Sequence, residues 1–418
     1  MRTNEPTRRE LLAGLAVPAA AMLVKGAPVA AAENGSSAVV VGSGVFGAWT
    51  AWHLRQRGFR VTLVDAFGAG NSRSSSGGET RVTRAAYGPD EIYTRWARAS
   101  LPAWKALAER SGQRLFVETG MLILATASDP RIVLSQKTLD RLGVPHSVFG
   151  RAELARRFPQ IALDGIEAGL FEPEAGALLA RRAVAALADE LEARGVRRVM
   201  ARVLPPEPVN GRLSEIRTAG GETILADRFV FACGPWMNKL FPALLGQRLF
   251  VTRQEVLFFG VPAGDARFAP PRLPVWLSGD FYGIPDIESR GFKIANDQHG
   301  PALDPDSADR VPSAEAIEAA RSFLAIRFPA LAEAPLVEAR ICQYENSANG
   351  DLLIDRHPQA GNIVLVGCGS GHGFKHGPAV GELAAALAAG DAALAAETAL
   401  DPRLTLATKA DAQQRAVH

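Results

Sequence analysis

The segment AVVVGSGVFG, residues 38–47, decides the fold expected for this chain. Its first four residues are apolar and typical of a buried strand, and its three glycines predict a tight turn into a helix over residues 48–56. Gly42 permits the sharp turn, and Gly44 lets the backbone approach a diphosphate. Gly47 lets the helix pack closely against the strand while the helix N-terminus faces the phosphates.

A second apolar strand, residues 60–64, follows that helix and leads into Asp65. This spacing places a carboxylate where it bonds a ribose hydroxyl of a dinucleotide. The alternative is a glycine-rich turn that only packs, but the order strand, turn, helix, strand, aspartate favours a dinucleotide site. NAD and the ADP half of FAD are held by the same glycines, so the motif leaves both cofactors open.

The first 32 residues have the layout of a twin-arginine export signal. Arg8 and Arg9 precede an apolar run over residues 11–24, and small residues at 30–32 supply a cleavage site. An uncleaved membrane anchor is the alternative, but the run is short for a span and rich in Gly, Pro and Ala. Twin-arginine export carries folded proteins with their cofactor bound, which favours FAD over a dissociable nicotinamide. We therefore expect a periplasmic protein that meets a membrane only during export.

Charge and cysteine content exclude several functions. The chain has a net charge of +2, and the signal carries all of it, so the mature chain is neutral. A neutral chain gives no reason to expect nucleic acid or an acidic membrane surface as a partner. Three cysteines are too few for a disulfide framework and leave at least one thiol unpaired. Cys233 and Cys368 end apolar strands and are interpreted as packing residues, and no metal site is expected.

Helix and strand patterns alternate along the rest of the chain without an internal repeat. Amphipathic patterns predict helices over residues 93–110 and 180–194, and residues 121–125 predict a strand. An Ala-rich terminal helix is expected over residues 382–398, interrupted at Gly390.

Apolar strands at residues 228–233 and 361–367 suit the parallel sheet that begins at residues 39–41. Residues 251–336 contain more proline and alternating strand patterns, which indicate a second domain on an antiparallel or mixed sheet. We therefore expect an α/β fold with a discontinuous Rossmann-type FAD-binding domain and a second, α+β, substrate (catalytic) domain. The expected boundaries are 1–32 for the signal, 36–115, 170–242 and 340–400 for the FAD-binding domain, 116–169 and 243–339 for the substrate domain, and 401–418 for a C-terminal tail.

Further motifs follow in order along the mature chain. They are Gly78-Glu-Thr-Arg81-Val-Thr-Arg84-Ala-Ala-Tyr87, Glu172-Pro-Glu-Ala-Gly176, Cys233-Gly-Pro-Trp236, Tyr282-Gly with Lys293, Cys342-Gln-Tyr344 and Ser370-Gly-His-Gly-Phe-Lys375. With the glycine motif they resemble the monomeric sarcosine oxidases and N-methyl amino acid oxidases of the D-amino-acid-oxidase-like flavoprotein family. The resemblance implies an FAD-dependent oxidase of a secondary or N-methylated amino acid, which forms an imine and, with O₂ as second substrate, hydrogen peroxide.

The resemblance also implies a covalent flavin. Cys342 matches the cysteine that joins the flavin 8α-methyl carbon through a thioether, although most free cysteines are small buried hydrophobes. On a strand, Cys342 and Tyr344 point to the same face. The reaction needs a thiolate, which the neighbouring Arg340 or another nearby cation would favour.

Four cations receive roles in the same way. Arg81 and Arg84 share a face on a helix but oppose one another on a strand. Arg84 matches the arginine that grips the substrate carboxylate and Arg81 the arginine against the flavin ring, whereas two solvated arginines are the alternative. Lys375 is the second cation for the carboxylate, at the start of the last helix, whose amides stabilise the reduced flavin. Lys293 matches the lysine that promotes reaction with O₂ by stabilising superoxide, although most such lysines face water.

The expected site therefore comprises two sets of residues. The catalytic set is Lys293, Arg81, Arg84, Lys375, Tyr282 and Tyr344. The cofactor-binding set is Gly42, Gly44, Val45, Phe46, Gly47, Asp65, Ala66, Ser76, Thr80, Arg81, Val203, Gly234, Trp236, Cys342, Gly371, His372, Gly373, Phe374 and Lys375.

Two departures from sarcosine oxidase concern the substrate. The family histidine four residues after the lysine is replaced by Asp297, with His299 two residues further on, and a histidine before Arg81 is replaced by Gly77. An aspartate in the pocket opposes a carboxylate and favours a second amine, which argues against sarcosine but not against the class. The alternatives are a dehydrogenase that serves a periplasmic or membrane acceptor and a non-catalytic flavin or amino acid binding protein.

Overall fold

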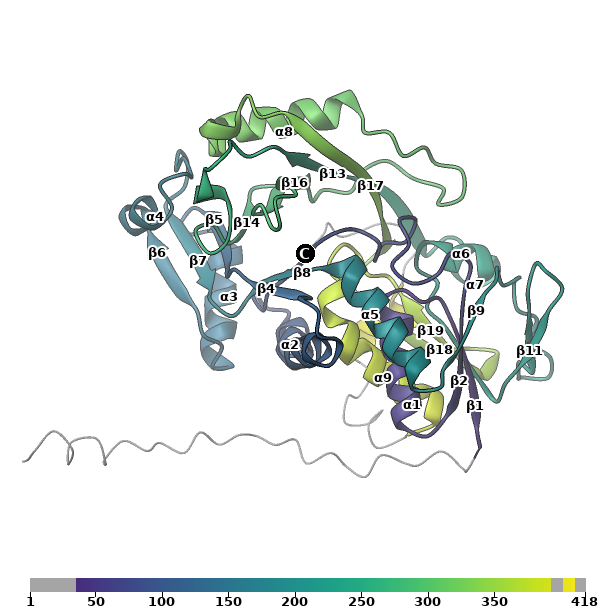
Figure 1. Cartoon of the computed structure of the whole chain (residues 1–418). Helices are drawn as coiled ribbons and strands as arrows, with labels where there is room; N and C mark the ends of the chain where they lie inside the picture. The colour runs from purple at the N-terminus through teal and green to yellow at the C-terminus, as the bar shows by residue number, and fades with distance from the viewer. Residues whose placement is uncertain (1–34, 392–400, 410–418) are drawn as a thin grey trace, which may run out of the picture.

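The computed structural model describes residues 35–391 and 401–409. The predicted export signal lies outside these residues. Figure 1 shows two large units, a sheet flanked by helices α1, α5 and α9 and a second sheet that runs from β6 to β17. None of the described helices is long and apolar enough to cross a membrane.

A six-stranded sheet forms the first unit, in the order β18-β19-β12-β1-β2-β9. All neighbouring strands are parallel except β18, which pairs antiparallel with β19 at the edge. The strands are β1 (Ser37–Val41), β2 (Arg60–Asp65), β9 (Arg197–Met200), β12 (Arg228–Phe231), β18 (Leu353–His357) and β19 (Ala360–Gly367). The three apolar runs predicted to share a parallel sheet are thus neighbours in it, and this prediction is confirmed.

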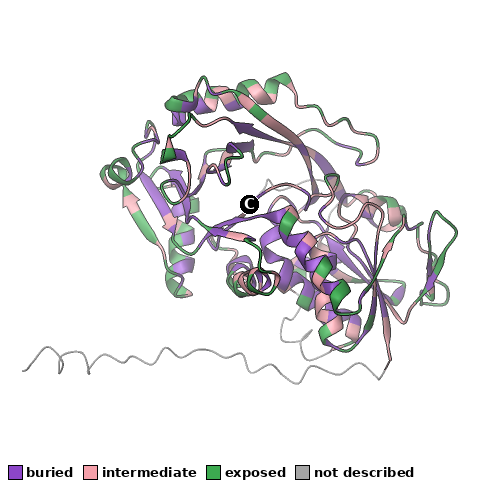
Figure 2. Ribbon diagram, viewed as in Figure 1, coloured by how far each residue is buried: buried purple, intermediate pink, exposed green. Residues whose placement is uncertain are grey.

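Helices cover one face of this sheet and share its hydrophobic core. They are α1 (Val45–Gln56), α2 (Glu91–Ser111), α5 (Ala180–Ala193) and α9 (Gly377–Ala389). The other face is covered by the hairpin of β10 (Glu215–Arg217) and β11 (Thr223–Leu225) and by the short α6 (Met237–Leu240) and α7 (Pro242–Leu245). Figure 2 shows most strands buried and the helices exposed on their outer sides.

The terminal helix differs from its prediction. It begins earlier, at Gly377, and ends before Gly390, whose φ of 78° is the left-handed conformation that glycine adopts after a helix. The predicted continuation over residues 392–398 lies outside the described residues. The predicted helices at 93–110 and 180–194 are confirmed to within two residues at each end.

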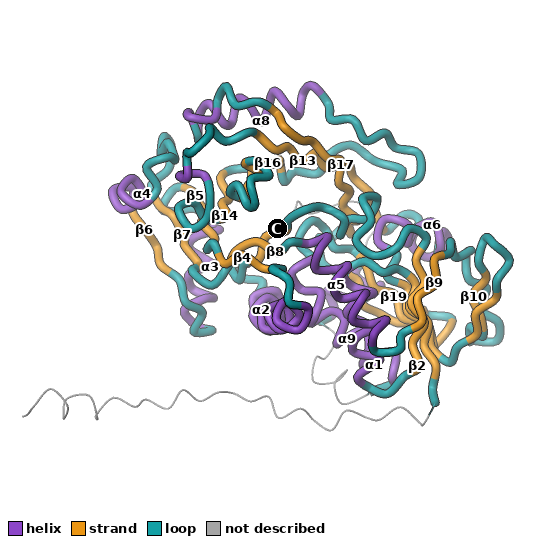
Figure 3. The backbone as a smooth tube through the Cα atoms, in the orientation of Figure 1, coloured by secondary structure: helices purple, strands orange, loops and turns teal. Residues whose placement is uncertain are grey.

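An eight-stranded mixed sheet forms the second unit, in the order β17-β13-β16-β15-β14-β5-β7-β6. Only β5 and β14 pair parallel. The strands are β5 (Met121–Ala125), β6 (Ser147–Gly150), β7 (Ala168–Glu172), β13 (Leu249–Phe259), β14 (Val275–Ser278), β15 (Phe281–Ile284), β16 (Phe292–Asn296) and β17 (Leu336–Ser347). Its helices are α3 (Pro130–Arg141), α4 (Arg151–Arg157) and α8 (Ala314–Arg327). In Figure 3, α4 and α8 lie on the outer side of this sheet.

A small three-stranded sheet of β3 (Arg81–Thr83), β8 (Gly176–Leu178) and β4 (Phe116–Glu118) lies between the two units. The expected boundaries at residues 170 and 340 fall inside β7 and β17, which belong to the eight-stranded sheet. β17 therefore belongs to the eight-stranded sheet over its whole length, whereas the expected boundary at residue 340 assigned its two parts to different domains. The described residues also contain six short 3-10 helices, at Gly234–Trp236, Ala266–Phe268, Pro329–Leu331, Phe374–His376, Pro402–Leu404 and Leu406–Thr408.

The described part of the expected C-terminal tail packs against the body of the protein. Leu404 and Leu406 are buried in the two cores of the six-stranded sheet. Lys409 is buried as well, and its Nζ donates to the carbonyl oxygens of Arg403 and Asp351 at 2.7 and 3.1 Å.

Candidate active site

A cavity of about 420 Å³ is lined by residues of both large sheets. On one side it meets the carboxyl ends of β1, β2 and β12, the usual place for ligands in a parallel sheet. On the other side it meets Tyr282, Asp297, Cys342 and Tyr344 from the eight-stranded sheet. One continuous space therefore joins the predicted dinucleotide end to the predicted substrate end.

The dinucleotide end has the backbone geometry that the glycine motif predicted. Gly42 has a φ of 100°, and a Cβ there would lie 2.2 Å from the carbonyl oxygen of Ala232. A Cβ at Gly47 would lie 1.8 Å from the carbonyl oxygen of Gly42, so this glycine lets helix and strand pack. Asp65 accepts a hydrogen bond from the Ser43 amide at 2.7 Å and lines the cavity.

Most of the predicted cofactor-binding residues line this cavity. They are Gly42, Gly44, Val45, Phe46, Asp65, Ala66, Ser76, Arg81, Val203, Gly234, Trp236, Cys342, Gly371, His372, Gly373, Phe374 and Lys375. Gly47 and Thr80 are not in the lining. The Thr80 carbonyl instead accepts hydrogen bonds from Arg81 Nη1 at 2.8 Å and from Lys293 Nζ at 3.0 Å.

The cation beside the Cys342 thiol is Arg81. Its Nη2 donates to Cys342 Sγ at 3.3 Å and to the Ser75 carbonyl at 2.5 Å. Arg340, the cation that the sequence suggested, instead forms ion pairs with Glu79 and Glu338.

Arg84 and Lys375 both line the cavity and meet at Tyr87. Because residues 81–83 form a strand, Arg81 and Arg84 point to opposite faces. The Arg84 guanidinium stacks 4.1 Å from the centre of the Tyr87 ring and donates to the Ala86 carbonyl. Lys375 Nζ donates to Tyr87 Oη at 2.7 Å. Burial, with Arg84 nearby, lowers the pKa of Lys375 well below its ordinary value.

Tyr87 and Glu172 lie within two of the sequence motifs, but no role could be predicted for either residue from the sequence. Glu172 is buried, and its carboxylate accepts the backbone amides of Ala85 and Ala86 at 2.7 and 3.0 Å. It thereby fixes the backbone that follows Arg84. The only signal for both residues was their place in the motifs, because their contacts are long-range.

Lys293 is only 2% exposed, so the water-facing alternative is wrong. Its neighbours Phe292 and Ile294 enter the opposite core, as the strand pattern predicted. Burial, together with the nearby Arg81, lowers the pKa of Lys293 to about 7. Lys293 does not line the first cavity but a second one, which it shares with Arg81 and Cys342.

The substrate end contains one carboxylate among cations. Asp297 lines the cavity and accepts a hydrogen bond from Tyr344 Oη at 3.1 Å. Burial raises its pKa to about 6, against the lowering effect of the Tyr344 hydrogen bond and of Arg84, Lys375 and Lys293. His299 lies outside the lining, and Gly77 has no room for a side chain, because a Cβ there would lie 1.8 Å from the Asn71 carbonyl oxygen.

The three cysteines are free. Cys368 is buried in the core as expected, whereas Cys233 lines the cavity, so its interpretation as a packing residue was incomplete. Sequence reasoning also missed Glu345, which lines the cavity and accepts the Cys368 amide at 2.9 Å. Burial raises the pKa of Glu345 to about 8.

The residues present fit FAD. Four side-chain oxygens in or beside the cavity are buried without a hydrogen-bond partner among the described residues: Ser43 Oγ, Thr80 Oγ1, Gln343 Oε1 and Glu345 Oε1. Such groups are costly unless a ligand or water satisfies them. Gly42 and Asp65 would hold the ADP half, and Arg81, Cys342 and the loop at residues 371–375 the flavin half.

Comparison with known proteins agrees with this geometry. Residues 37–387 match the family described as DAO, FAD dependent oxidoreductase. The human peroxisomal sarcosine oxidase is 31% identical over 366 residues, which cover 85% of this chain and 92% of that protein. The N-methyl-L-tryptophan oxidase of Yersinia pestis is 27% identical, with coverage of 84% and 94%.

Solved structures share the fold. Fructosyl amine:oxygen oxidoreductase (Amadoriase I) from Aspergillus fumigatus superposes with a TM-score of 0.74 at 22% identity, over 92% of this chain and 94% of that one. L-proline dehydrogenase from P. horikoshii also gives a TM-score of 0.74 at 22% identity, over 85% and 93%. From the family match and the human relative, this chain belongs to the family of FAD-dependent oxidoreductases.

Proposed function

We propose that this protein is an FAD-dependent oxidase of a secondary or N-methylated amino acid, with an imine and hydrogen peroxide as its products. The observation that carries the proposal is one cavity in which the dinucleotide cradle at Gly42 continues into a cationic pocket at Arg84 and Lys375. The sarcosine oxidase and N-methyl-L-tryptophan oxidase relatives support the same class of substrate.

Arg84 and Lys375 bind the substrate carboxylate. Both side chains are buried and contact Tyr87: Arg84 stacks on the Tyr87 ring, and Lys375 donates a hydrogen bond to the Tyr87 hydroxyl. Cations that are already in place need no reorganisation when the carboxylate arrives, so they fix the orientation of the carbon–nitrogen bond. The arriving negative charge also favours protonated Lys375, whose pKa is lowered in its absence.

When bound, FAD would accept two electrons and a proton from the carbon attached to the amine nitrogen, which leaves an imine, and would pass the electrons on to O₂. Tyr282 and Tyr344 line the substrate end of the cavity, and Asp297, hydrogen-bonded to Tyr344, adds a carboxyl group to the same lining. With a pKa of about 6, Asp297 is mostly ionised at neutral pH. It then attracts a cationic group and repels a second carboxylate. We therefore expect the substrate to carry a second amino group, unlike sarcosine.

Cys342 is the proposed thioether link to the flavin. Arg81 supports this role, because a guanidinium beside a sulfur stabilises the thiolate that attacks. Lys293 supplies the buried cation that stabilises superoxide as O₂ accepts an electron.

An anaerobic screen of secondary and N-methylated amino acids, with and without a second amino group, tests the proposal. Bleaching of the flavin spectrum, followed on aeration by oxygen uptake and peroxide formation, is the expected result. Bleaching that is reversed only by an artificial acceptor would instead assign a dehydrogenase. Failure of every such amino acid to bleach the flavin would contradict the substrate class.

We also propose that the protein is exported folded, with its cofactor, by the twin-arginine route. The proposal rests on the sequence of residues 1–32, with the pair Arg8 and Arg9 as its main support.

A further inference from the structure

A second cavity, of about 510 Å³, lies beside the first. Arg81 and Cys342 line both cavities, so they form the wall between them. The buried Lys293 lines only the second. An occupant of the second cavity would therefore lie next to the Cys342 side chain, the proposed point of flavin attachment, without touching the substrate end.

Basic side chains dominate the second cavity. Its lining holds Arg73, Arg81, Arg181, Lys293, Arg310 and Arg340. The two carboxylates in the lining already have cationic partners. Glu79 pairs with Arg340 at 2.8 Å and with Arg181 at 3.4 Å. Asp306 pairs with Lys239 at 2.6 Å.

Arg73 and Arg310 have no carboxylate within ion-pair distance in the part of the chain that the structure describes. Among the described residues, the Arg310 guanidinium makes only two long hydrogen bonds, at 3.4 Å each, to the carbonyl oxygens of Ile341 and Pro305. Burial lowers the pKa of Arg310, and the nearby Arg73 lowers it further. An anion in the cavity would offset the repulsion between these two arginines.

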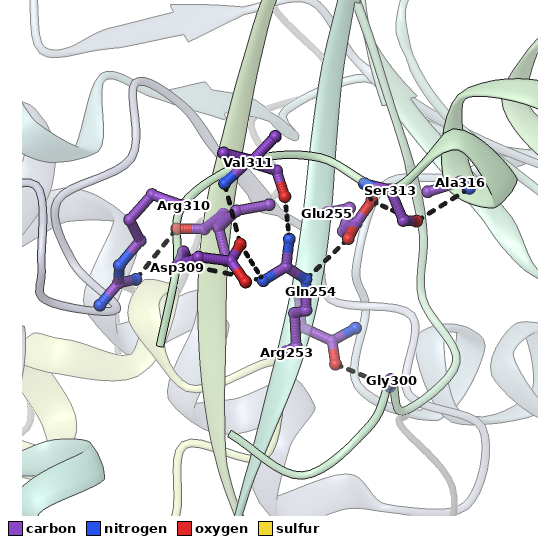
Figure 4. A network of polar contacts seen from close by, with 10 residues as sticks. Arg253, Gln254, Glu255, Gly300, Asp309, Arg310, Val311, Ser313 and Ala316 are labelled. Atoms are coloured by element: carbon purple, nitrogen blue, oxygen red, sulfur yellow. Dashed lines mark hydrogen bonds and ion pairs between the residues drawn. The ribbon is translucent and has the colours of Figure 1, made fainter. Parts of the chain in front are cut away.

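The segment that carries Arg310 is fixed rather than free. Figure 4 shows Arg253 hydrogen-bonded to Glu255, Asp309 and Val311, and Arg310 beside this network. Glu255 accepts hydrogen bonds from the amide and the hydroxyl of Ser313 at 3.0 Å each. The backbone that carries Arg310 is therefore already ordered before a ligand binds, which favours binding.

We propose that the second cavity binds an anionic electron acceptor whose charge is carried on carboxylate, phosphate or similar groups, and that the protein can pass electrons to this acceptor as well as to O₂. The role in electron transfer rests on the proposed function, because the flavin supplies the electrons. The binding of anions by Arg73 and Arg310 does not.

The redox step balances with a one-electron anionic acceptor such as ferricyanide. The reduced flavin gives up two electrons and one proton and returns to its oxidised form. Two ferricyanide ions each gain one electron and become ferrocyanide, and the proton passes to solvent. Bound anion also favours the charged form of Lys293, whose pKa burial lowers to about 7.

Titration of the flavin-loaded protein with inorganic phosphate tests the binding. We expect calorimetry to show saturable binding that weakens as ionic strength rises. The double variant Arg73→Met, Arg310→Met should lose at least about tenfold in affinity, whereas Arg310→Lys should keep most of it. Arg217→Met is the matched control, because Arg217 is an exposed arginine on β10 outside this cavity.

Stopped-flow reoxidation after chemical reduction with dithionite tests the electron transfer without any amino acid substrate. The double variant should react about tenfold more slowly with ferricyanide but as fast as the parent with uncharged benzoquinone. The result of this reoxidation experiment does not depend on whether any N-methylated amino acid proves to be a substrate.

Two results would overturn the proposal. The proposed anion site is ruled out if phosphate does not bind, or if it binds equally to the parent and the double variant. Ferricyanide rates that are equal in the parent and the double variant remove its role in electron transfer, even where phosphate binds. A double variant with altered thermal stability is replaced by Arg310→Gln alone, from which we expect the same direction of change.

Discussion

Arg81 Nη2 lies 3.3 Å from Cys342 Sγ, although the two residues are 261 positions apart in the chain. The guanidinium is held by the carbonyl oxygens of Ser75 and Thr80, so its position does not depend on the thiol. A fixed cation stabilises a thiolate, and a thiolate is the form that attacks the flavin. The contact therefore joins the arginine motif to the proposed site of covalent attachment.

Covalent attachment is tested by acid precipitation. The parent should keep its yellow colour in the precipitate, whereas Cys342→Ala should release all flavin into the supernatant. Arg81→Met should attach flavin more slowly, because the thiolate loses its cation, and a time course of gel fluorescence measures the rate. Cys233→Ala is the matched control and should keep the covalent flavin. Complete release of flavin from the parent would contradict a covalent link at Cys342.

Lys293 should govern the reaction with O₂. Lys293→Met keeps most of the side-chain length and removes the charge, which we expect to cost about 3 to 4 kcal/mol of barrier, or about two to three powers of ten in the rate of reoxidation. Anaerobic reduction by substrate should change much less. Stopped-flow absorbance at the flavin band measures both steps.

The pH dependence of reoxidation provides a control for this assignment. Because burial lowers the pKa of Lys293 to about 7, its charge is present below pH 7 and lost as the pH rises through this value. The parent should therefore react with O₂ more slowly above pH 7, and Lys293→Met should show no such step. A variant that reacts with O₂ as fast as the parent would assign the reaction to another group.

The dinucleotide end could be predicted from the sequence because its determinants are close together in the chain. Gly42, Gly47 and Asp65 lie within 24 residues, and each has a backbone or spacing requirement that the sequence displays. The face of Lys293 followed from strand alternation in the same way. What periodicity left open was whether that face is buried, because a distant segment lies against it: Lys293 Nζ donates to the carbonyl oxygen of Thr80.

Contacts between distant segments were harder to predict. Sequence proximity suggested Arg340 as the partner of Cys342, but side chains from another sheet decide such contacts, and Arg81 has that place. The roles of Tyr87 and Glu172 were missed for the same reason. The boundary expected at residue 340 lies inside β17, which continues through it without any turn signal.

Tyr87→Phe tests whether Tyr87 positions Arg84 and Lys375, the two cations proposed to bind the substrate carboxylate. The variant keeps the ring under Arg84 but removes the hydroxyl to which Lys375 donates at 2.7 Å. Loss of a hydrogen bond to a charged group is worth about 1.5 to 3 kcal/mol. We expect a rise in KM of roughly ten- to hundredfold with a smaller change in kcat. An unchanged KM in steady-state assays would show that the Tyr87 hydroxyl does not position Lys375 for the carboxylate.

Export is tested in cells. Changing Arg8 and Arg9 together to lysine should leave the protein in the cytoplasm, folded and carrying its flavin, because the route requires the arginine pair. Fractionation with flavin fluorescence as the readout measures the result. Secretion that continues unchanged would contradict the twin-arginine route.

Asp297 should select the substrate, and pH should reveal it. Burial raises the pKa of Asp297 to about 6, so its negative charge appears as the pH rises through 6. For an amino acid with a second amino group, kcat/KM should therefore rise across this range in the parent. Asp297→Asn should abolish the step and lower the plateau roughly ten- to hundredfold, the cost of a charged hydrogen bond worth about 1.5 to 3 kcal/mol.

The same substitution should act on stability in the opposite direction. Because the pKa of Asp297 is raised in the folded protein, the folded state holds this proton more tightly than the unfolded chain does, and that contribution to stability is lost as the pH rises through about 6. Asp297→Asn should therefore raise Tm at pH 8 and change it little at pH 4, whereas the exposed control Asp164→Asn should change neither. A variant that lost both activity toward diamino substrates and stability at pH 8 would indicate a structural role for Asp297. Loss of activity together with a gain in stability is the signature of a carboxylate kept in the cavity for its substrate.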